Sequence, residues 1–162
     1  MKYPLRLYII AEEMSADNKF RLYNALSRIR QDFEVVPDWG LETRIAYRDK
    51  IEGEWVPNPY VDIIFDERRI AEEAKTLKNI YGEEYHSICF IFKVENWKAT
   101  YGGLNVGGMF SGMSVQLAKW YNREDWIYEV LVEEIAHCID EQVWRETGVK
   151  VEDYLGLPPG VD

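Results

Sequence analysis

The residues best suited to chemistry lie in one stretch, Glu-Val-Leu-Val-Glu-Glu-Ile-Ala-His-Cys-Ile-Asp-Glu, at positions 129–141. If this stretch is helical, its polar residues fall within an arc of about 140°. These residues are Glu129, Glu133, Glu134, His137, Asp140 and Glu141. Carboxylates gathered in this way repel one another, and a bound cation, a protonated His137 or a neighbouring Arg or Lys would relieve the repulsion. The open alternative is a solvated acidic helix face without metal, on which His137 is hydrogen-bonded.

The same stretch resembles the signature of the zincin metallopeptidases, in which His-Glu-x-x-His lies on a helix, often continued as Glu-Ile-Ala-His-x-x-Asp. In that motif the two His residues bind zinc from one face of the helix, and the Glu acts as general base. Glu134 matches that Glu, and His137 matches the second His. Glu133 stands where the first His belongs. The resemblance therefore implies Glu133 and His137 as metal ligands and Glu134 as the catalytic residue.

The departure at Glu133 bears on which metal is expected. Glu and His at positions i and i+4 can both reach one ion, so the site stays geometrically open. A carboxylate ligand lowers the Lewis acidity of the ion and favours harder metals. The resemblance thus implies one divalent metal, with zinc first and manganese or calcium as alternatives, and a site without metal stays open. For the third ligand, Glu152 or Asp153 is the candidate, because Asp140 and Val143 stand where metzincins continue with Gly and His.

Hydrophobic periodicity predicts the elements that position this helix. Helices are predicted at 16–33, with Ser15 as N-cap, at 67–80, closed by Gly82, and at 123–146. Strands are predicted at 5–10, 35–40, 42–47, 60–65 and 86–94. Gly and Pro predict a loop or hairpin tip at 49–59 and a glycine-rich loop at 101–112. The alternating segment 113–120 is predicted as an edge strand.

This order of elements predicts the fold class. Strand, helix, strands, helix, strand, glycine-rich loop, edge strand and long helix are typical of an α+β fold of α/β character. We expect a single domain over residues 1–162, with one mixed twisted sheet and the long helix packed beside an edge strand. The zincin resemblance implies the same order. In addition, 60–65 resembles the Ala-Asp-Ile-x-Ile strand of matrixin-like members, and 101–108 lies where the substrate-binding edge is expected.

Composition restricts the partners. Nineteen basic and 29 acidic residues give a net charge of −10, which repels phosphate backbones and anionic membranes, so direct binding of nucleic acid or a membrane is not expected. The sequence contains neither a signal-peptide block nor an apolar run of the roughly 20 residues that span a bilayer, so we expect a cytoplasmic location. Cys89 and Cys138 lie in apolar runs and are expected to be buried thiols rather than a disulfide.

These observations lead to one functional prediction with two alternatives. The prediction is a metallopeptidase-like protein with an altered Glu-Glu-x-x-His motif, either a divergent metal-dependent peptide hydrolase or a lapsed one. A peptide or protein is expected to bind in extended form along the predicted edge strand 113–120. The alternatives are a non-catalytic protein-binding module on the same fold and an acidic inhibitor of a nucleic-acid-binding protein. His86, the other histidine, is interpreted as a structural residue.

Overall fold

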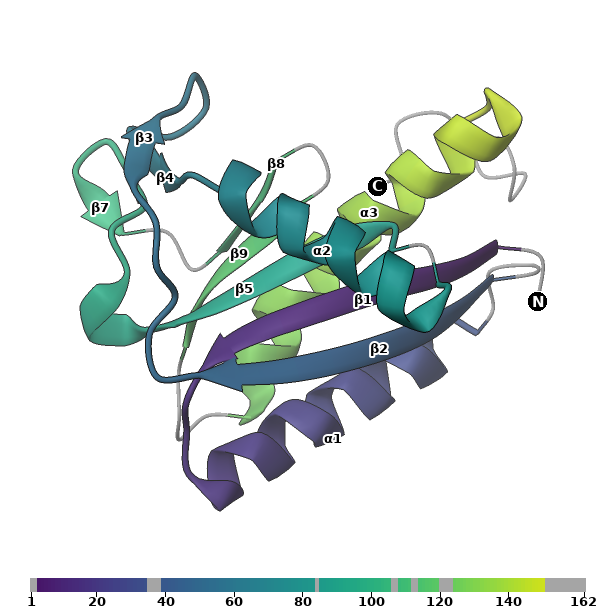
Figure 1. Ribbon diagram of the computed structural model, residues 1–162, viewed down its shortest axis with the longest axis horizontal. Helices are drawn as coiled ribbons and strands as arrows, with labels where there is room; N and C mark the ends of the chain where they lie inside the picture. Colours follow the sequence, from purple (N-terminus) through teal and green to yellow (C-terminus); the bar gives the residue numbers. More distant parts are fainter. Residues whose placement is uncertain are drawn as a thin grey trace.

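One mixed sheet organises the chain in the computed structural model, which describes residues 3–34, 39–83, 85–105, 108–111, 114–119 and 124–150 (Figure 1). The strand order is β2-β1-β5-β9-β8. Four strands run parallel: β1 (Tyr3–Glu12), β2 (Trp39–Arg48), β5 (Ser87–Lys93) and β9 (Ser114–Lys119). The short strand β8 (Gly108–Ser111) pairs antiparallel with β9 and forms one edge. The prediction of a mixed sheet with packed helices is confirmed.

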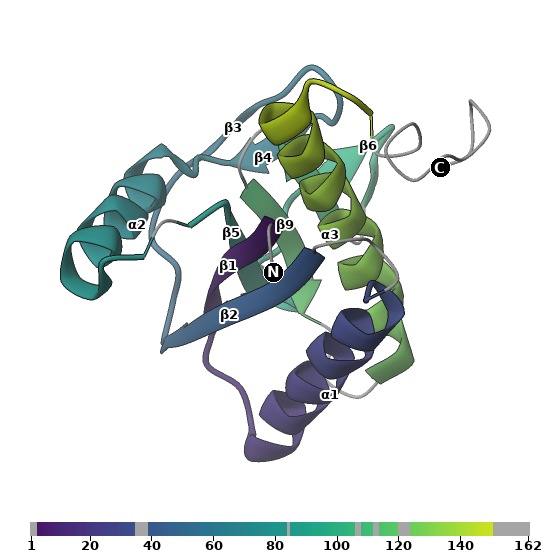
Figure 2. The same cartoon turned by 90° about the vertical axis from the view of Figure 1, so that its right-hand side faces the viewer.

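In the described part of the chain, three α-helices cover the sheet. Helices α1 (Ala16–Asp32) and α3 (Glu124–Thr147) share one face. Helix α2 (Arg68–Tyr81) lies on the opposite face (Figure 2). The alternation of β1 sets the two layers, because Leu7 and Ile9 face α1 and α3 whereas Tyr8 and Ile10 face the side of α2.

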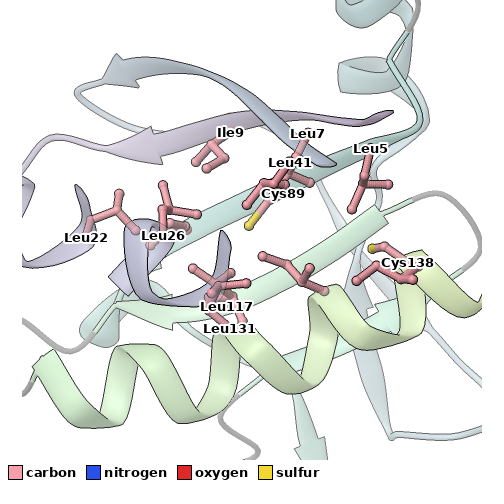
Figure 3. Close-up of a cluster of buried hydrophobic side chains, with 14 of the residues drawn as sticks. Leu5, Leu7, Ile9, Leu22, Leu26, Leu41, Cys89, Leu117, Leu131 and Cys138 are labelled. Atoms are coloured by element: carbon pink, nitrogen blue, oxygen red, sulfur yellow. The ribbon is translucent and has the colours of Figure 1, made fainter. Parts of the chain in front are cut away.

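The larger hydrophobic cluster lies between the sheet and the α1–α3 layer (Figure 3). It includes Leu22 and Leu26, four residues apart on α1, and Leu131 and Ile135, four residues apart on α3. Cys89 and Cys138 belong to the same cluster as free, buried thiols, as predicted. Two aromatic residues of α1 are exposed although they are apolar, Phe20 at 64% and Tyr23 at 61%. These two side chains lie outside the arc centred on Leu22, Leu26 and Ile29.

Helix ends agree with the sequence signals. The Ser15 hydroxyl accepts a hydrogen bond of 3.2 Å from the main-chain N–H of Asn18 and caps α1. Gly82 ends α2 with a φ of 69°, a left-handed conformation that glycine adopts without a Cβ clash. Gly148 follows α3 with a φ of 70°, and its N–H bonds the carbonyl of Trp144.

Several strand boundaries differ from the prediction. A single strand, β2, replaces the two predicted at 35–40 and 42–47, of which 35–38 lie outside the described residues. In the predicted strand 60–65 only β4 (Ile63–Phe65) is extended, paired with β3 (Trp55–Pro57). The reason is a local turn, because the Asn58 side chain accepts hydrogen bonds from the N–H groups of Tyr60 and Val61.

The glycine-rich segment and the predicted edge strand also need correction. Within 101–112 the chain forms the hairpin of β6 (Thr100–Tyr101) and β7 (Leu104–Asn105), followed by β8. A 3-10 turn, η1 (Val94–Asn96), precedes the hairpin. The prediction that 113–120 is an edge strand is wrong, because β9 lies between β5 and β8. Strand β8 instead forms this edge of the sheet among the described residues. The prediction failed because the alternating pattern of β9 does not indicate which strands lie beside it.

Candidate functional site

The long helix α3 lies across the sheet and contacts β1, β9 and the edge strand β8. Its apolar residues Leu131, Ile135 and Ile139 are buried against the sheet. At its amino-terminal part, the Tyr128 hydroxyl donates a hydrogen bond to Asp32 of α1, and the Arg28 guanidinium lies 3.8 Å from the Tyr128 ring centre. The packing of the two helices therefore sets which residues of α3 face outward, next to the edge of the sheet.

The structure separates the predicted site residues into two groups. Glu133 and His137 are exposed and lie one turn apart, together with Glu129 and Asp140, and we call these four residues the acidic face of α3. Glu134 is only 7% exposed and lies in the interface between helix and sheet. The six polar residues that fall within one helical arc therefore do not share one exposed face, because Glu134 is buried. On the helix, Glu134 is about 40° from buried Cys138 and about 100° from Glu133.

The surroundings of Glu134 disfavour its charged form. Burial raises the pKa of this carboxyl from 4.5 to about 7, and the negative charge of Glu133 adds to the effect. Its Oε2 atom is buried and has no hydrogen-bond partner among the described residues. A carboxyl group in this situation is protonated at low pH and ionises near neutrality, which is where a general base has to work.

The two cysteine thiols lie near this carboxyl. Burial raises the pKa of Cys89 well above its ordinary value, and the charges of Cys138 and Glu134 contribute. Burial likewise raises the pKa of Cys138 to about 12. The Cys138 thiol donates a hydrogen bond of 3.4 Å to the Ser87 hydroxyl. Both thiols therefore stay protonated and act as small apolar groups rather than as nucleophiles.

Carboxylate repulsion on α3 is partly relieved by one of the means considered above. The guanidinium of Arg145 donates to Glu141 over 2.9 Å, an i to i+4 pair at the edge of the acidic face. The carboxylates of the acidic face itself are exposed to water, so their mutual repulsion is screened.

The described residues of this helix supply only part of the ligand set that a metal ion needs. Glu133 and His137 supply an oxygen and a nitrogen donor one turn apart, the spacing at which two side chains of a helix reach one ion. Among the described residues, no group of three or more His, Cys, Asp or Glu side chains is placed to hold a metal ion. The predicted third ligands, Glu152 and Asp153, lie outside the described residues.

His86 has structural contacts, in agreement with its interpretation as a structural residue, and so has Glu83, three residues before it. The Nδ1 atom of His86 accepts a hydrogen bond of 2.9 Å from the main-chain N–H of Arg6, and the N–H of His86 bonds the Arg6 carbonyl. Glu83 accepts two hydrogen bonds from the Arg44 guanidinium, at 2.9 and 3.0 Å. The contacts of His86 extend the pairing of β1 with β5, and those of Glu83 tie the segment before β5 to β2.

Sequence reasoning missed a buried carboxylate at the other end of the sheet. Glu12 is fully buried where β1 ends, and it accepts hydrogen bonds from the N–H groups of Lys93 (2.6 Å) and Ile51 (3.4 Å). The side chain of Asn96 donates a third, at 3.0 Å. The carboxylate thus ties together three segments at the carboxyl ends of the parallel strands. An acid directly after the apolar run Tyr-Ile-Ile-Ala was the available signal.

Comparison with protein families finds no family model that matches this chain, and no curated protein matches it either. Within the described residues, no helix has the length and apolar character that crossing a membrane requires.

Proposed function

We propose that this chain is a zincin-like metalloprotein of the peptidase type, with its site on α3 beside the edge strand β8. The order of its elements supports the proposal, because a long helix follows an antiparallel edge pair at the side of a mixed sheet. The observation that carries the proposal is the Glu134 carboxyl. It is buried and incompletely hydrogen-bonded, one residue from an exposed acid and three from an exposed imidazole.

Retaining such a group has an energetic cost, which makes a chemical role a natural explanation. Burying a carboxyl without its full set of hydrogen bonds costs on the order of 1–3 kcal/mol. A leucine or methionine at position 134 would avoid this cost and extend the buried stripe of Leu131 and Cys138. A carboxyl with a pKa of about 7 can instead take a proton from water during peptide hydrolysis.

The remaining residues would hold the metal and the substrate. Glu133 and His137 would bind a divalent ion, and such an ion supplies Lewis acidity that polarises a peptide carbonyl. Zinc is the first candidate, and the carboxylate of Glu133 makes manganese or calcium the alternatives. An extended peptide would add to the outer edge of β8, the last strand of the sheet among the described residues.

The test combines metal content with cleavage. Protein purified without chelator is assayed for bound metal, and zinc, manganese and calcium are titrated calorimetrically into wild type and His137→Ala. The proposal expects one ion per chain, loss of binding in His137→Ala, and cleavage of a quenched-fluorescent peptide library that Glu134→Gln abolishes. If wild type binds none of the three ions and cleavage is absent or unchanged by Glu134→Gln, the proposal is wrong.

A second candidate is a non-catalytic protein-binding module on the same fold, favoured by Glu133 itself, because a carboxylate in this position weakens the activation of water. The variant Glu133→His separates the two candidates, with Glu146→His, at an exposed position on the same helix, as the matched control. Zinc binding and cleavage by Glu133→His alone would show a site that lacks only its first ligand. Zinc binding without cleavage would favour the binding module.

A further inference from the structure

A cavity of about 620 Å³ lies between α2 and the sheet, on the side of β5. Its walls are mainly apolar and include Ala71, Ala74, Tyr85 and Ile88. Lys75 and Lys78 also line it, and both are exposed side chains. The cavity lies on the face of the sheet opposite α3, so it is separate from the acidic face and from Glu134.

The sequence of α2 explains why the cavity exists. Ile70 is the buried residue of this helix, and the next two positions toward the sheet are the small residues Ala71 and Ala74. Larger side chains there would fill the space between helix and strand. The ring of Tyr85, which lines the cavity, contacts the ring of Tyr8, with centroids 5.4 Å apart.

Charge is distributed unevenly around α2. Ala71, Ala74, Lys75 and Lys78 recur at three- and four-residue spacing and therefore form one stripe along the helix. The acidic residues Glu72 and Glu73 line a different cavity, on the side of β2. Among the described residues, no carboxylate lines the cavity beside β5. Lys75 and Lys78 thus place two cations at an apolar cavity, in a chain with a net charge of −10.

We propose that this cavity binds a small amphiphilic carboxylate. The apolar body of the ligand would lie against Ala74, Tyr85 and Ile88, and its carboxylate would pair with Lys75 and Lys78. The volume and the mostly apolar lining with a few polar groups are those of small-molecule sites. The two lysines favour an anion over a neutral or cationic ligand, because their ammonium groups attract its negative charge. This proposal is independent of metal binding at α3.

The experiment uses 1-pyrenebutyric acid and its methyl ester, which share the same apolar body and differ in charge. Fluorescence titration measures the Kd of each probe for the wild-type chain. We expect saturable binding of both, with the acid bound about tenfold more tightly, since each exposed ion pair contributes a few-fold. In Lys75→Glu/Lys78→Glu the acid should bind at least tenfold more weakly than to wild type, and the ester should be unchanged within twofold.

Two further variants complete the test. Lys50→Glu/Arg69→Glu changes the net charge by the same amount, but at the cavity on the other side of α2. It should leave the Kd of both probes within twofold of the wild-type values. Ala74→Phe fills the cavity and should weaken both probes at least tenfold, with helix content checked by circular dichroism. The proposal is overturned if wild type shows no saturable binding, if the two double reversals weaken the acid equally, or if folded Ala74→Phe binds both probes like wild type.

Discussion

Replacing Glu134 by Gln should make the protein more stable above neutral pH and should flatten its pH dependence. The change keeps the shape of the side chain and removes its ability to ionise. In the folded chain the pKa of this carboxyl is raised from 4.5 to about 7, first by burial and second by the charge of Glu133. Each unit of pKa corresponds to about 1.4 kcal/mol, so the ionised form costs about 3 kcal/mol in the folded state.

The sign follows from proton linkage. Between pH 4.5 and 7 the folded chain holds a proton on Glu134 that the unfolded chain has released. The stability that this proton provides is therefore present below pH 4.5 and is lost as the pH rises to 7. Glutamine stays neutral throughout, so the free energy of unfolding of the variant, minus that of wild type, should increase by about 2–3 kcal/mol from pH 5 to pH 8.

Urea denaturation at pH 5, 6, 7 and 8 with chelator present measures this difference. Glu141→Gln is a suitable control, since Glu141 is more exposed and pairs with Arg145. Subtracting the free energy of unfolding of wild type from that of the variant at each pH cancels the contribution of the other titrating groups. Parallel curves for wild type and Glu134→Gln over this range would refute the reasoning, because they would mean that the carboxyl is hydrated or charge-paired in solution.

Three further predictions concern packing and burial. Glu12→Ala should lower the free energy of unfolding by about 3 kcal/mol or more, since it leaves three donors without their acceptor; urea denaturation measures the loss, and a change below 1 kcal/mol would contradict it. Gly53→Ala should lower the stability by about 1–3 kcal/mol, because a Cβ there would lie 2.2 Å from Cζ of Phe65; an unchanged melting temperature would speak against this contact. Cys89 and Cys138 should resist Ellman's reagent in the folded chain and react in denaturant, and rapid reaction of the folded chain would show that the thiols are accessible.

The helices could be predicted well from the sequence because their signals are local. Leu22, Leu26 and Ile29 recur at the helical period, Ser15 caps the first turn, and Gly82 supplies the left-handed residue after α2. Each of these signals depends on residues within a few positions of one another, so a single sequence contains them.

Strand pairing could not be predicted in the same way because it is non-local. The alternation of β9 fits an edge strand and an inner strand equally, and its neighbour β8 lies in a glycine-rich segment with little strand propensity. Asn58 shortened the strand expected at 60–65 through a side-chain turn that composition alone did not favour over extension.

Within the candidate site, the burial of Glu134 was not predicted, because its residue type indicated exposure although its position on the helix indicated burial. Leu131, Glu134 and Cys138 follow one another at three- and four-residue spacing, which marks one stripe of the helix, and all three are buried. A carboxylate is ordinarily placed in water, so the sequence pattern favoured the outer face. Glu133 and His137 do lie on that face, where both residue type and spacing gave the same prediction.

The central position of β1 has a consequence for how the chain reaches its native state. This strand pairs with β2 after one helical crossover, but its other neighbour lies about 80 residues further along, with Leu7 opposite Ser87. Such distant pairing raises the contact order, so we expect slow folding, on the millisecond-to-second scale. A nascent chain released before β5 is complete would leave one side of β1 open, and this apolar strand would then be available to another molecule.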